Sequence, residues 1–283
     1  MRVYEAIAPE QAEGMRLDKY ISLAFSLLPS PVTRDAFSHR DVKADGKRMN
    51  RDAAVHAGQR IQVYTNYEVS LPIVYEDEHI VLLNKPAGIS CDADAWGGMT
   101  VLNLMTARAA GAYVPRLCHR LDHPTCGLLL LCKDDESESL LLDAFKNRTL
   151  DKKYQCIVKG EMRPPEALKE AYLVKDAEKA LVRIVTHETP GALPIATQYE
   201  TLCFDGETSR LRVTLLTGRT HQIRAHMAFL SHPILGDDKY GDRMFNKRFK
   251  TTTLHLCATE LTLNVEGCLA YLNVKTFVID PPF

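Results

Sequence analysis

Residues 119–127, His-Arg-Leu-Asp-His-Pro-Thr-Cys-Gly, run directly into the four leucines Leu128–Leu131. Such an apolar run indicates a buried strand. A charged carboxylate beside it must be paired or hydrogen-bonded, because an isolated buried charge costs several kcal/mol or more. We therefore expect Asp122 to lie on a tight loop at a sheet edge, next to a cation, as catalytic carboxylates do. On this segment alone, a purely structural Arg120–Asp122 ion pair explains the pattern equally well.

Length and composition are those of an ordinary globular protein that is large enough for one large domain and one small one. The chain has 283 residues, of which 46% are hydrophobic and 25% charged. Its net charge of −1 gives no global sign of nucleic-acid binding, so basic residues that contact RNA or DNA would have to be grouped locally.

The eight cysteines form no Cys-x-x-Cys pair, which argues against a structural zinc site and against a disulfide framework. Several stand in apolar runs and are expected to be buried thiols in a reducing compartment. The first residues lack the apolar region of a signal peptide, and no segment approaches the ~20 apolar residues that span a bilayer. These features predict a cytoplasmic protein without membrane segments.

Residues 16–64 are predicted to form a small separate unit. Its expected elements are a helix over Arg16–Leu28 that Pro29 and Pro31 end, a helix over Thr33–Arg40 capped by Thr33, and short strands around Asp45-Gly46 and over residues 60–64. Between positions 34 and 60 there are seven Lys or Arg against four Asp. The simplest interpretation of these charges is a solvated face.

A polar linker is expected over residues 65–71, and from Ile73 the pattern becomes rich in strands. The predicted elements are strands at 80–83, 128–131, 153–158, 198–204, 209–216, 254–263 and 269–279, with helices at 136–147 and 220–230, the latter capped by Thr220. Many strands with few helices between them favour an α+β sheet domain over a doubly wound one.

Two further segments carry candidate functional residues. In Thr217–His226, Arg219 and Arg224 flank an expected helix start, a geometry that suits an anion. His221 and His226 are five residues apart, which does not place them together for a metal. Tyr154 follows Lys152 and Lys153, a combination that fits base stacking with phosphate contact, although packing alone also explains a strand tyrosine. Lys85, in a Lys-Pro-x-Gly turn, is a weaker candidate.

Together these segments resemble the RluA-type pseudouridine synthases. The motifs follow the family's order within residues 73–283: Lys85-Pro86-x-Gly88, His119-Arg120-Leu121-Asp122-x-x-Thr125-x-Gly127, Lys152-x-Tyr154, Thr217-Gly218-Arg219-Thr220-His221-Gln222-Ile223-Arg224, and His232-Pro233-Ile234-x-Gly236-Asp237 with Tyr240-Gly241. Each motif is weak by itself, whereas five in the same order are specific. In the Asp122 loop, Cys126 replaces the usual Ser and His123 stands where Arg is common.

The resemblance implies an α+β fold. A catalytic domain over residues 73–283 would have a mixed, largely antiparallel central sheet with flanking helices. Residues 1–67 look like the small α/β RNA-binding domain of alpha-L type that often precedes it, and Arg16, Arg34 and Arg40 are its candidate RNA contacts. That match is looser, since Arg40 stands where the family usually has Gly and Asp45 where it prefers Asn.

The resemblance also implies roles for single residues. Asp122 would attack or deprotonate the ribose while the uracil–sugar bond breaks, Arg224 would pair with it, and Tyr154 would stack on the uracil and assist proton removal from carbon 5. Arg120 would fill the space of the flipped-out base. Lys85, Lys152, Arg219 and His221 are expected to contact the substrate or the RNA. No cofactor and no metal are expected.

Three functions are compatible with the sequence. The leading hypothesis is isomerisation of uridine to pseudouridine in structured RNA, with ribosomal RNA favoured and transfer RNA open, by a monomeric enzyme. A noncatalytic RNA-binding or ribosome-assembly factor on the same fold is the main alternative. A hydrolytic nucleosidase would need a second carboxylate near Asp122 to activate water.

Overall fold

The computed structural model describes residues 1–176 and 181–283, which group into two compact units. Unit 1 comprises Met1–Pro72 and Gly88–Leu117, and unit 2 comprises Ile73–Ala87 and Cys118–Phe283. Residues 88–117 thus group with the N-terminal residues, although they were expected in the second domain. Where a folding domain begins and ends stays a prediction.

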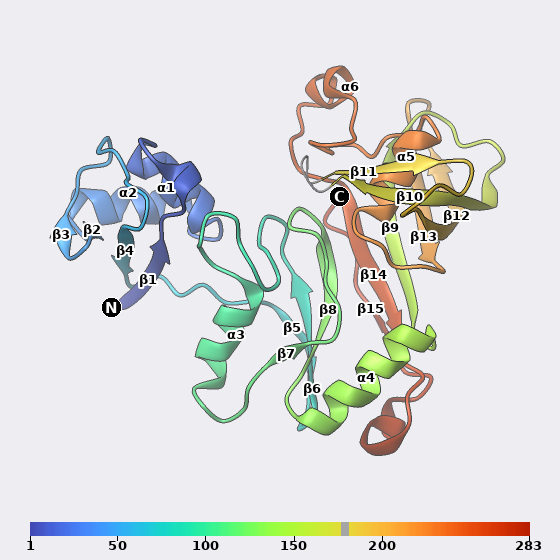
Figure 1. Ribbon diagram of the computed structural model, residues 1–283, viewed down its shortest axis with the longest axis horizontal. Helices are drawn as coiled ribbons and strands as arrows, with labels where there is room; N and C mark the ends of the chain where they lie inside the picture. Colours follow the sequence, from blue (N-terminus) through green and yellow to red (C-terminus); the bar gives the residue numbers. More distant parts are fainter. Residues whose placement is uncertain (177–180) are drawn as a thin grey trace. The chain divides into compact units, whose positions relative to one another are not determined.

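Unit 1 is built on a small antiparallel sheet with the strand order β1-β4-β2-β3. Its elements are β1 (Arg2–Ile7), η1 (Glu10–Ala12), α1 (Leu17–Ala24), α2 (Ser30–Ser38), β2 (Val42–Ala44), β3 (Lys47–Arg48), β4 (Arg60–Thr65), α3 (Val101–Ala109) and β7 (Arg116–Leu117) (Figure 1). Tyr20 and Ile21 of α1 and Ile61 and Val63 of β4 are almost fully buried, so the apolar face of α1 and the inner face of the sheet supply its core.

The predicted helix boundaries in unit 1 were wrong, because the prolines begin a helix. Helix α1 ends at Ala24, four residues before the expected end at Leu28. Pro29 is the N-cap of α2 and Pro31 lies in its first turn, where a missing N–H costs nothing. Thr33 is therefore inside α2, and its hydroxyl donates to the Ser30 carbonyl. Strand β1, which pairs with β4, was not expected at all.

Residues 88–117 are joined to the end of α1 by hydrogen bonds. The Ser26 hydroxyl donates to the Gly88 carbonyl at 2.6 Å, the Tyr20 hydroxyl donates to the Trp96 carbonyl at 2.8 Å, and the Met99 amide donates to the Ala24 carbonyl at 2.9 Å. A Cβ on Gly98 would lie 1.8 Å from the Ala24 carbonyl oxygen, so only glycine fits at this close approach. Deleting residues 1–67 would remove the surface on which this segment packs.

Arg40 has a left-handed backbone (φ 58°) immediately after α2. The Arg40 amide donates to the Phe37 carbonyl and the Asp41 amide to the Ala36 carbonyl, which together form a Schellman cap. Glycine adopts this conformation without a Cβ clash. The cap gives a physical reason why related sequences would prefer glycine where this chain has arginine.

We predict that Arg40→Gly stabilises unit 1, because it relieves strain of about 1 kcal/mol in the left-handed conformation. Arg34→Gly is the matched control, since Arg34 lies inside α2 and glycine there costs about 1 kcal/mol. Thermal unfolding should show a higher midpoint for the first variant and a lower one for the second. A lower midpoint for Arg40→Gly would contradict the assignment of strain.

Unit 2 contains one large mixed sheet. Its elements are β5 (Ile73–Glu76), β6 (Ile80–Lys85), β8 (Cys126–Cys132), α4 (Asp135–Asn147), β9 (Asp151–Lys159), β10 (Glu166–Asp176), β11 (Leu181–Val185), β12 (Leu193–Phe204), β13 (Thr208–Leu215), α5 (Gln222–Phe229), α6 (Arg243–Arg248), β14 (Leu256–Thr262), η2 (Gly267–Leu272) and β15 (Thr276–Val278) (Figure 1). The strand order is β11-β10-β12-β13-β9-β14-β8-β6-β5, with β15 beside β14. Strands β8 and β14 pair in parallel and the other named pairs are antiparallel. The expected mixed, largely antiparallel α+β sheet is confirmed.

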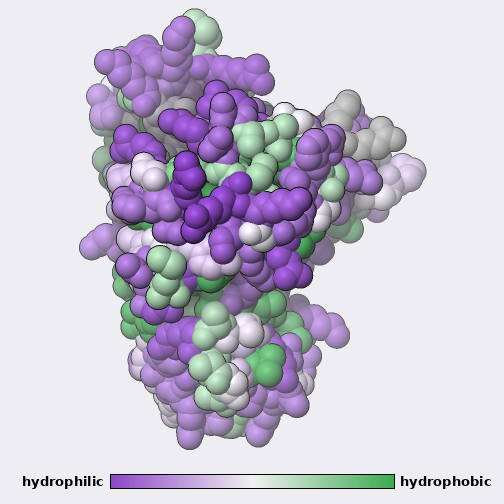
Figure 2. Space-filling view, turned by 90° about the vertical axis from the view of Figure 1, so that its left-hand side faces the viewer, coloured by the Kyte–Doolittle hydropathy of each residue, from purple (hydrophilic) through white to green (hydrophobic). Residues whose placement is uncertain are grey.

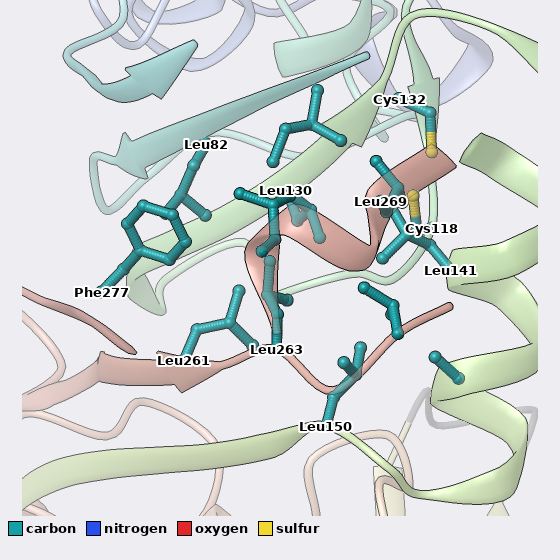
Figure 3. Close-up of a cluster of buried hydrophobic side chains, with 14 of the residues drawn as sticks. Leu82, Cys118, Leu130, Cys132, Leu141, Leu150, Leu261, Leu263, Leu269 and Phe277 are labelled. Carbon is teal, nitrogen blue, oxygen red and sulfur yellow. The ribbon is translucent and has the colours of Figure 1, made fainter. Parts of the chain in front are cut away.

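The leucine run forms the middle of β8, where Leu129–Leu131 are fully buried. The main core beside it joins β6, β8, α4, β14 and η2, as Figure 3 shows with Leu82, Leu130, Leu141 and Leu261 among its members. A smaller core packs β10, β11 and β12 against Ala225 of α5. The two cores fix β8 and α5, and these carry the candidate site.

The C-terminal strand expected over 269–279 was wrong. Residues 267–272 form the 3₁₀ helix η2, and only Thr276–Val278 are a strand. Leu269 and Leu272 are both fully buried, and a spacing of three places them on one face of a helix with three residues per turn.

Most cysteines are buried and free, as expected, with Cys203 exposed and Cys268 partly exposed. Among the residues described, no helix has both the length and the apolar character that a membrane crossing needs. The face of the molecule in Figure 2 is mainly hydrophilic, with apolar residues in smaller groups.

Candidate active site

Asp122 lies in the loop that leads into β8, and its carbonyl accepts a hydrogen bond from the Thr125 amide at 3.0 Å. Its carboxylate is partly exposed and lies 3.8 Å from Nη1 of Arg224, measured from Oδ2. Arg224 belongs to α5, and its side chain is only 1% exposed. The structure therefore brings together the two residues that the sequence placed far apart along the chain.

Arg224 has a second and tighter partner, Asp237, which the sequence pattern did not predict. Its Nε and Nη2 donate to the two carboxylate oxygens of Asp237, each at 2.7 Å, and Nη2 also donates to Asp238 at 2.8 Å. The Asp237 side chain is fully buried and also accepts from the Lys239 and Tyr240 amides. Arg224 and these amides lower the pKa of Asp237 against the opposing effect of burial.

This pairing corrects the interpretation of Arg224 as an arginine that offers its charge to an anion at a helix start. The start of α5 also differs from expectation, because His221, in a left-handed conformation, precedes it and Thr220 does not cap it. The Gln222 side chain accepts from the Arg219 amide and from the Thr217 hydroxyl. These side-chain bonds fix the loop that leads into α5.

Tyr154 lies in the middle of the sheet, on β9 between β13 and β14, and is 7% exposed. Burial raises the pKa of its hydroxyl strongly, and the negative charge of Asp122 raises it further. The phenol is therefore neutral at physiological pH. The two side chains are near enough for the charge of Asp122 to act on the phenol.

Gly127 lets the Asp122 loop approach β14 closely. Its φ is +111°, and a Cβ at this position would lie 2.3 Å from the Ala258 carbonyl oxygen and 2.5 Å from the Ala258 nitrogen. On its other side, Ala258 pairs with Tyr154 of the neighbouring strand β9. This pair lies next to an irregularity in β14 between Ala258 and Glu260. Only glycine fits both the backbone angle and the space, so Gly127 allows β8 to lie close against β14, the strand between β8 and the Tyr154 strand β9.

Lys85 is fully buried at the end of β6. Its ammonium donates to the Pro86 carbonyl at 3.0 Å and to the His123 carbonyl at 3.3 Å. Because His123 follows Asp122 directly, this placement suits holding the loop better than contacting RNA. Cys126 fits its position as well, since its thiol donates to the Leu256 carbonyl at 3.6 Å. A hydrogen bond from the neighbouring Cys257 thiol lowers the pKa of Cys126.

The remaining candidates lie around this centre or in unit 1. The His221 ring bonds the Tyr240 hydroxyl at 2.9 Å, and burial lowers its pKa. Arg120 and Arg219 are exposed, and Lys152 is partly buried. In unit 1, Arg16, Arg34 and Arg40 are all exposed, and Arg16 pairs with Asp18 at 2.7 Å.

Metal ligands are not grouped in the described parts of the chain, where no three His, Cys, Asp or Glu side chains come together in a way that could hold an ion.

We predict that Gly127→Ala destabilises unit 2 by more than about 3 kcal/mol, because the new methyl group collides with backbone that cannot move aside. Gly206→Ala is the control, because Gly206 has a similar φ of +98° but open space around it. It should cost about 1–2 kcal/mol. Urea unfolding measures the free energy of unfolding of both variants. Equal losses of stability would show that the close approach to Ala258 does not add to the cost of a side chain at Gly127.

Comparison with known proteins adds to this geometry. The family model described as RNA pseudouridylate synthase matches residues 79–229. An uncharacterized RNA pseudouridine synthase of Mycoplasma pneumoniae is 32% identical over 93% of this chain and 89% of its own length. The ribosomal large subunit pseudouridine synthase C of Vibrio cholerae is 28% identical over 84% of this chain and 80% of its own. Human RNA pseudouridylate synthase domain containing 1 shares the fold with a TM-score of 0.63, at 23% identity, over 76% of this chain and 84% of that structure.

Proposed function

Because the chain belongs to the RNA pseudouridylate synthase family, we propose that it converts uridine to pseudouridine in large-subunit ribosomal RNA. The choice of RNA rests on the names of relatives such as the Vibrio cholerae enzyme. The observation that carries the proposal is the Asp122 carboxylate, held 3.8 Å from a buried arginine and electrostatically coupled to the neutral Tyr154 phenol.

In the proposed reaction, Asp122 attacks or deprotonates the ribose while the bond between N1 of uracil and C1′ of the sugar breaks. The uracil turns and rejoins C1′ through its carbon 5, which releases a proton while N1 takes one up. Tyr154 stacks on the base. Since the raised pKa of Tyr154 keeps its hydroxyl protonated, the phenol would give up its own proton as it takes the one from carbon 5, and the proton that N1 takes up balances the one that carbon 5 loses.

The target nucleotide must leave its stack to reach Asp122, at a cost of a few kcal/mol. Arg120 is exposed, two residues before Asp122, and is proposed to fill the space that the base leaves. Unit 1 would add phosphate contacts that depend on salt and not on sequence. The cytoplasmic location, the monomeric state and the independence from cofactors remain predictions.

The geometry disfavours hydrolysis by a second carboxylate. Asp237 is a buried carboxylate that shares the Arg224 guanidinium with Asp122, and both of its oxygens are bonded to Arg224. Asp238 also bonds Arg224 through Oδ1. A carboxylate that is bound to a guanidinium in this way is a poor base for activating water. A noncatalytic RNA binder would not need a charged group at position 122 at all.

We predict that Asp122→Asn abolishes isomerisation, with a loss on the order of 10³-fold or more, because the reacting carboxylate is gone. RNA affinity should stay within about twofold, since the side chain keeps its size. Tritium release from ribosomal RNA labelled at carbon 5 of uridine measures the reaction.

Asp143→Asn, on the exposed side of α4, is the control for loss of one negative charge and should keep full activity. Normal tritium release by Asp122→Asn would contradict the proposed mechanism. No release by the wild type from any cellular RNA would favour the noncatalytic binder.

We also predict that Arg34→Gln and Arg40→Gln each weaken RNA binding and reduce the slope of log affinity against log salt by about 0.7–0.9. Arg16→Gln should have a smaller effect, because Arg16 already pairs with Asp18. Arg163→Gln in unit 2 is a control, since Arg163 pairs with Glu161. Filter binding over a range of KCl concentrations measures the slopes, and unchanged slopes for Arg34 and Arg40 would refute the role of unit 1.

A further inference from the structure

Two adjacent lysines at the start of β9 have different surroundings. Lys153 forms an ion pair with Glu260 on the neighbouring strand β14, with Nζ 2.5 Å from Oε1. The Lys152 side chain points to the other face of the sheet and, among the residues described, makes no hydrogen bond or ion pair. Burial lowers the pKa of its ammonium, and no carboxylate in the described ranges 1–176 and 181–283 offsets this effect. Partial burial of a cation without a counter-ion costs free energy, and the binding of an anion at this position would offset that cost.

Three other segments supply the neighbours of the Lys152 ammonium. Its Nζ lies 4.8 Å from the centre of the Phe145 ring of α4, and a Cβ on Gly218 would lie 3.7 Å from it. The His119 ring, in the Asp122 loop, lies 4.6 Å from the Phe145 ring.

His119 is neutral. Burial and the charge of Lys152 lower its pKa to about 3, and its Nε2 accepts a hydrogen bond from the Leu130 amide. The imidazole therefore brings no negative charge to the ammonium. Lys152 remains a positive group at a place where the Asp122 loop, α4 and the loop before α5 meet.

This cation lies close to the candidate active site. Lys152 and Tyr154 are two residues apart on β9, so their side chains share one face of the sheet with Cα atoms about 7 Å apart. Arg219 follows Gly218 directly; its side chain is exposed and has no hydrogen bond or ion pair within the described parts of the chain. A second cationic residue thus follows directly after Gly218, the backbone neighbour of the Lys152 ammonium.

We propose that Lys152 binds the backbone phosphate of the flipped uridine while Tyr154 contacts its base. The proposal rests on the proposed function, because it needs a nucleotide at Tyr154. A phosphodiester fits better than a carboxylate ligand, since a nucleotide carries its phosphate close to its base. Lysine suits this task as a compact point charge that needs no fixed direction of approach.

Three variants test the proposal: Lys152→Met, Lys152→Arg and, as a matched control, Lys153→Gln. The assay is tritium release from unmodified large-subunit ribosomal RNA labelled at carbon 5 of uridine, over a range of KCl concentrations. Lys152→Met should lower kcat/KM about tenfold near physiological salt, because a charge-assisted bond is lost. It should also reduce the slope of log kcat/KM against log salt by about 0.7–0.9, the share of one phosphate.

Lys152→Arg should keep the wild-type slope, and Lys153→Gln should keep both slope and rate. A wild-type slope in Lys152→Met would overturn the proposal, because a purely structural role leaves the salt dependence unchanged. An equal loss of slope in Lys153→Gln would overturn it as well. If the wild type releases no tritium, the proposed function fails. The phosphate contact is then tested by the affinity of wild type and Lys152→Met for the same RNA. Equal affinities at every salt concentration would reject the contact.

Discussion

The buried guanidinium of Arg224 is the interaction on which the candidate site depends. An arginine that is 1% exposed needs negative partners, because removal of one partner from a buried ion pair leaves an uncompensated charge. Asp237 provides two bonds and Asp238 a third, and Nη1 faces Asp122. The Tyr240 ring lies 5.4 Å from the guanidinium, and its hydroxyl accepts from the Val182 amide of β11. The charge cluster is thereby tied to the edge of the sheet.

The candidate site also requires that β8 and β14 approach each other closely. Gly127 and the irregularity in β14 allow this approach. Gly127 allows the start of β8 to lie against Ala258 of β14, and Ala258 pairs with Tyr154 on β9. The Asp122 loop and the tyrosine are therefore brought together through one residue of β14. Lys85 holds the same loop from the other side through the His123 carbonyl. Packing of the backbone of β8, β14 and β9 thus contributes to the placement of the two proposed reactive groups.

The sequence predicted what depends on local pattern. The leucine strand, the α4 helix and the hairpin around Asp205-Gly206 were found because their periods and turn residues are strong. Helix ends were less predictable, because Pro29 can end one helix or begin the next. The pairing of Arg224 with Asp237 could not be derived, since they are thirteen positions apart in the sequence with a turn between them. Only tertiary structure decides which carboxylate a buried arginine meets. Lys152 and Lys153 look equivalent in sequence and differ only in the sheet face to which they point.

The arrangement around Arg224 also explains why one arginine has several carboxylate partners. In the proposed reaction Asp122 gives up its negative charge for a time, either in a bond to the ribose or with a proton. If Asp122 were the sole counter-ion, this step would leave Arg224 buried and unpaired, at a cost of several kcal/mol. The bidentate bonds to Asp237 keep the guanidinium neutralised and in place throughout. Nη1 can then face Asp122 as a preorganised positive group whose own stability does not depend on the state of the reacting carboxylate.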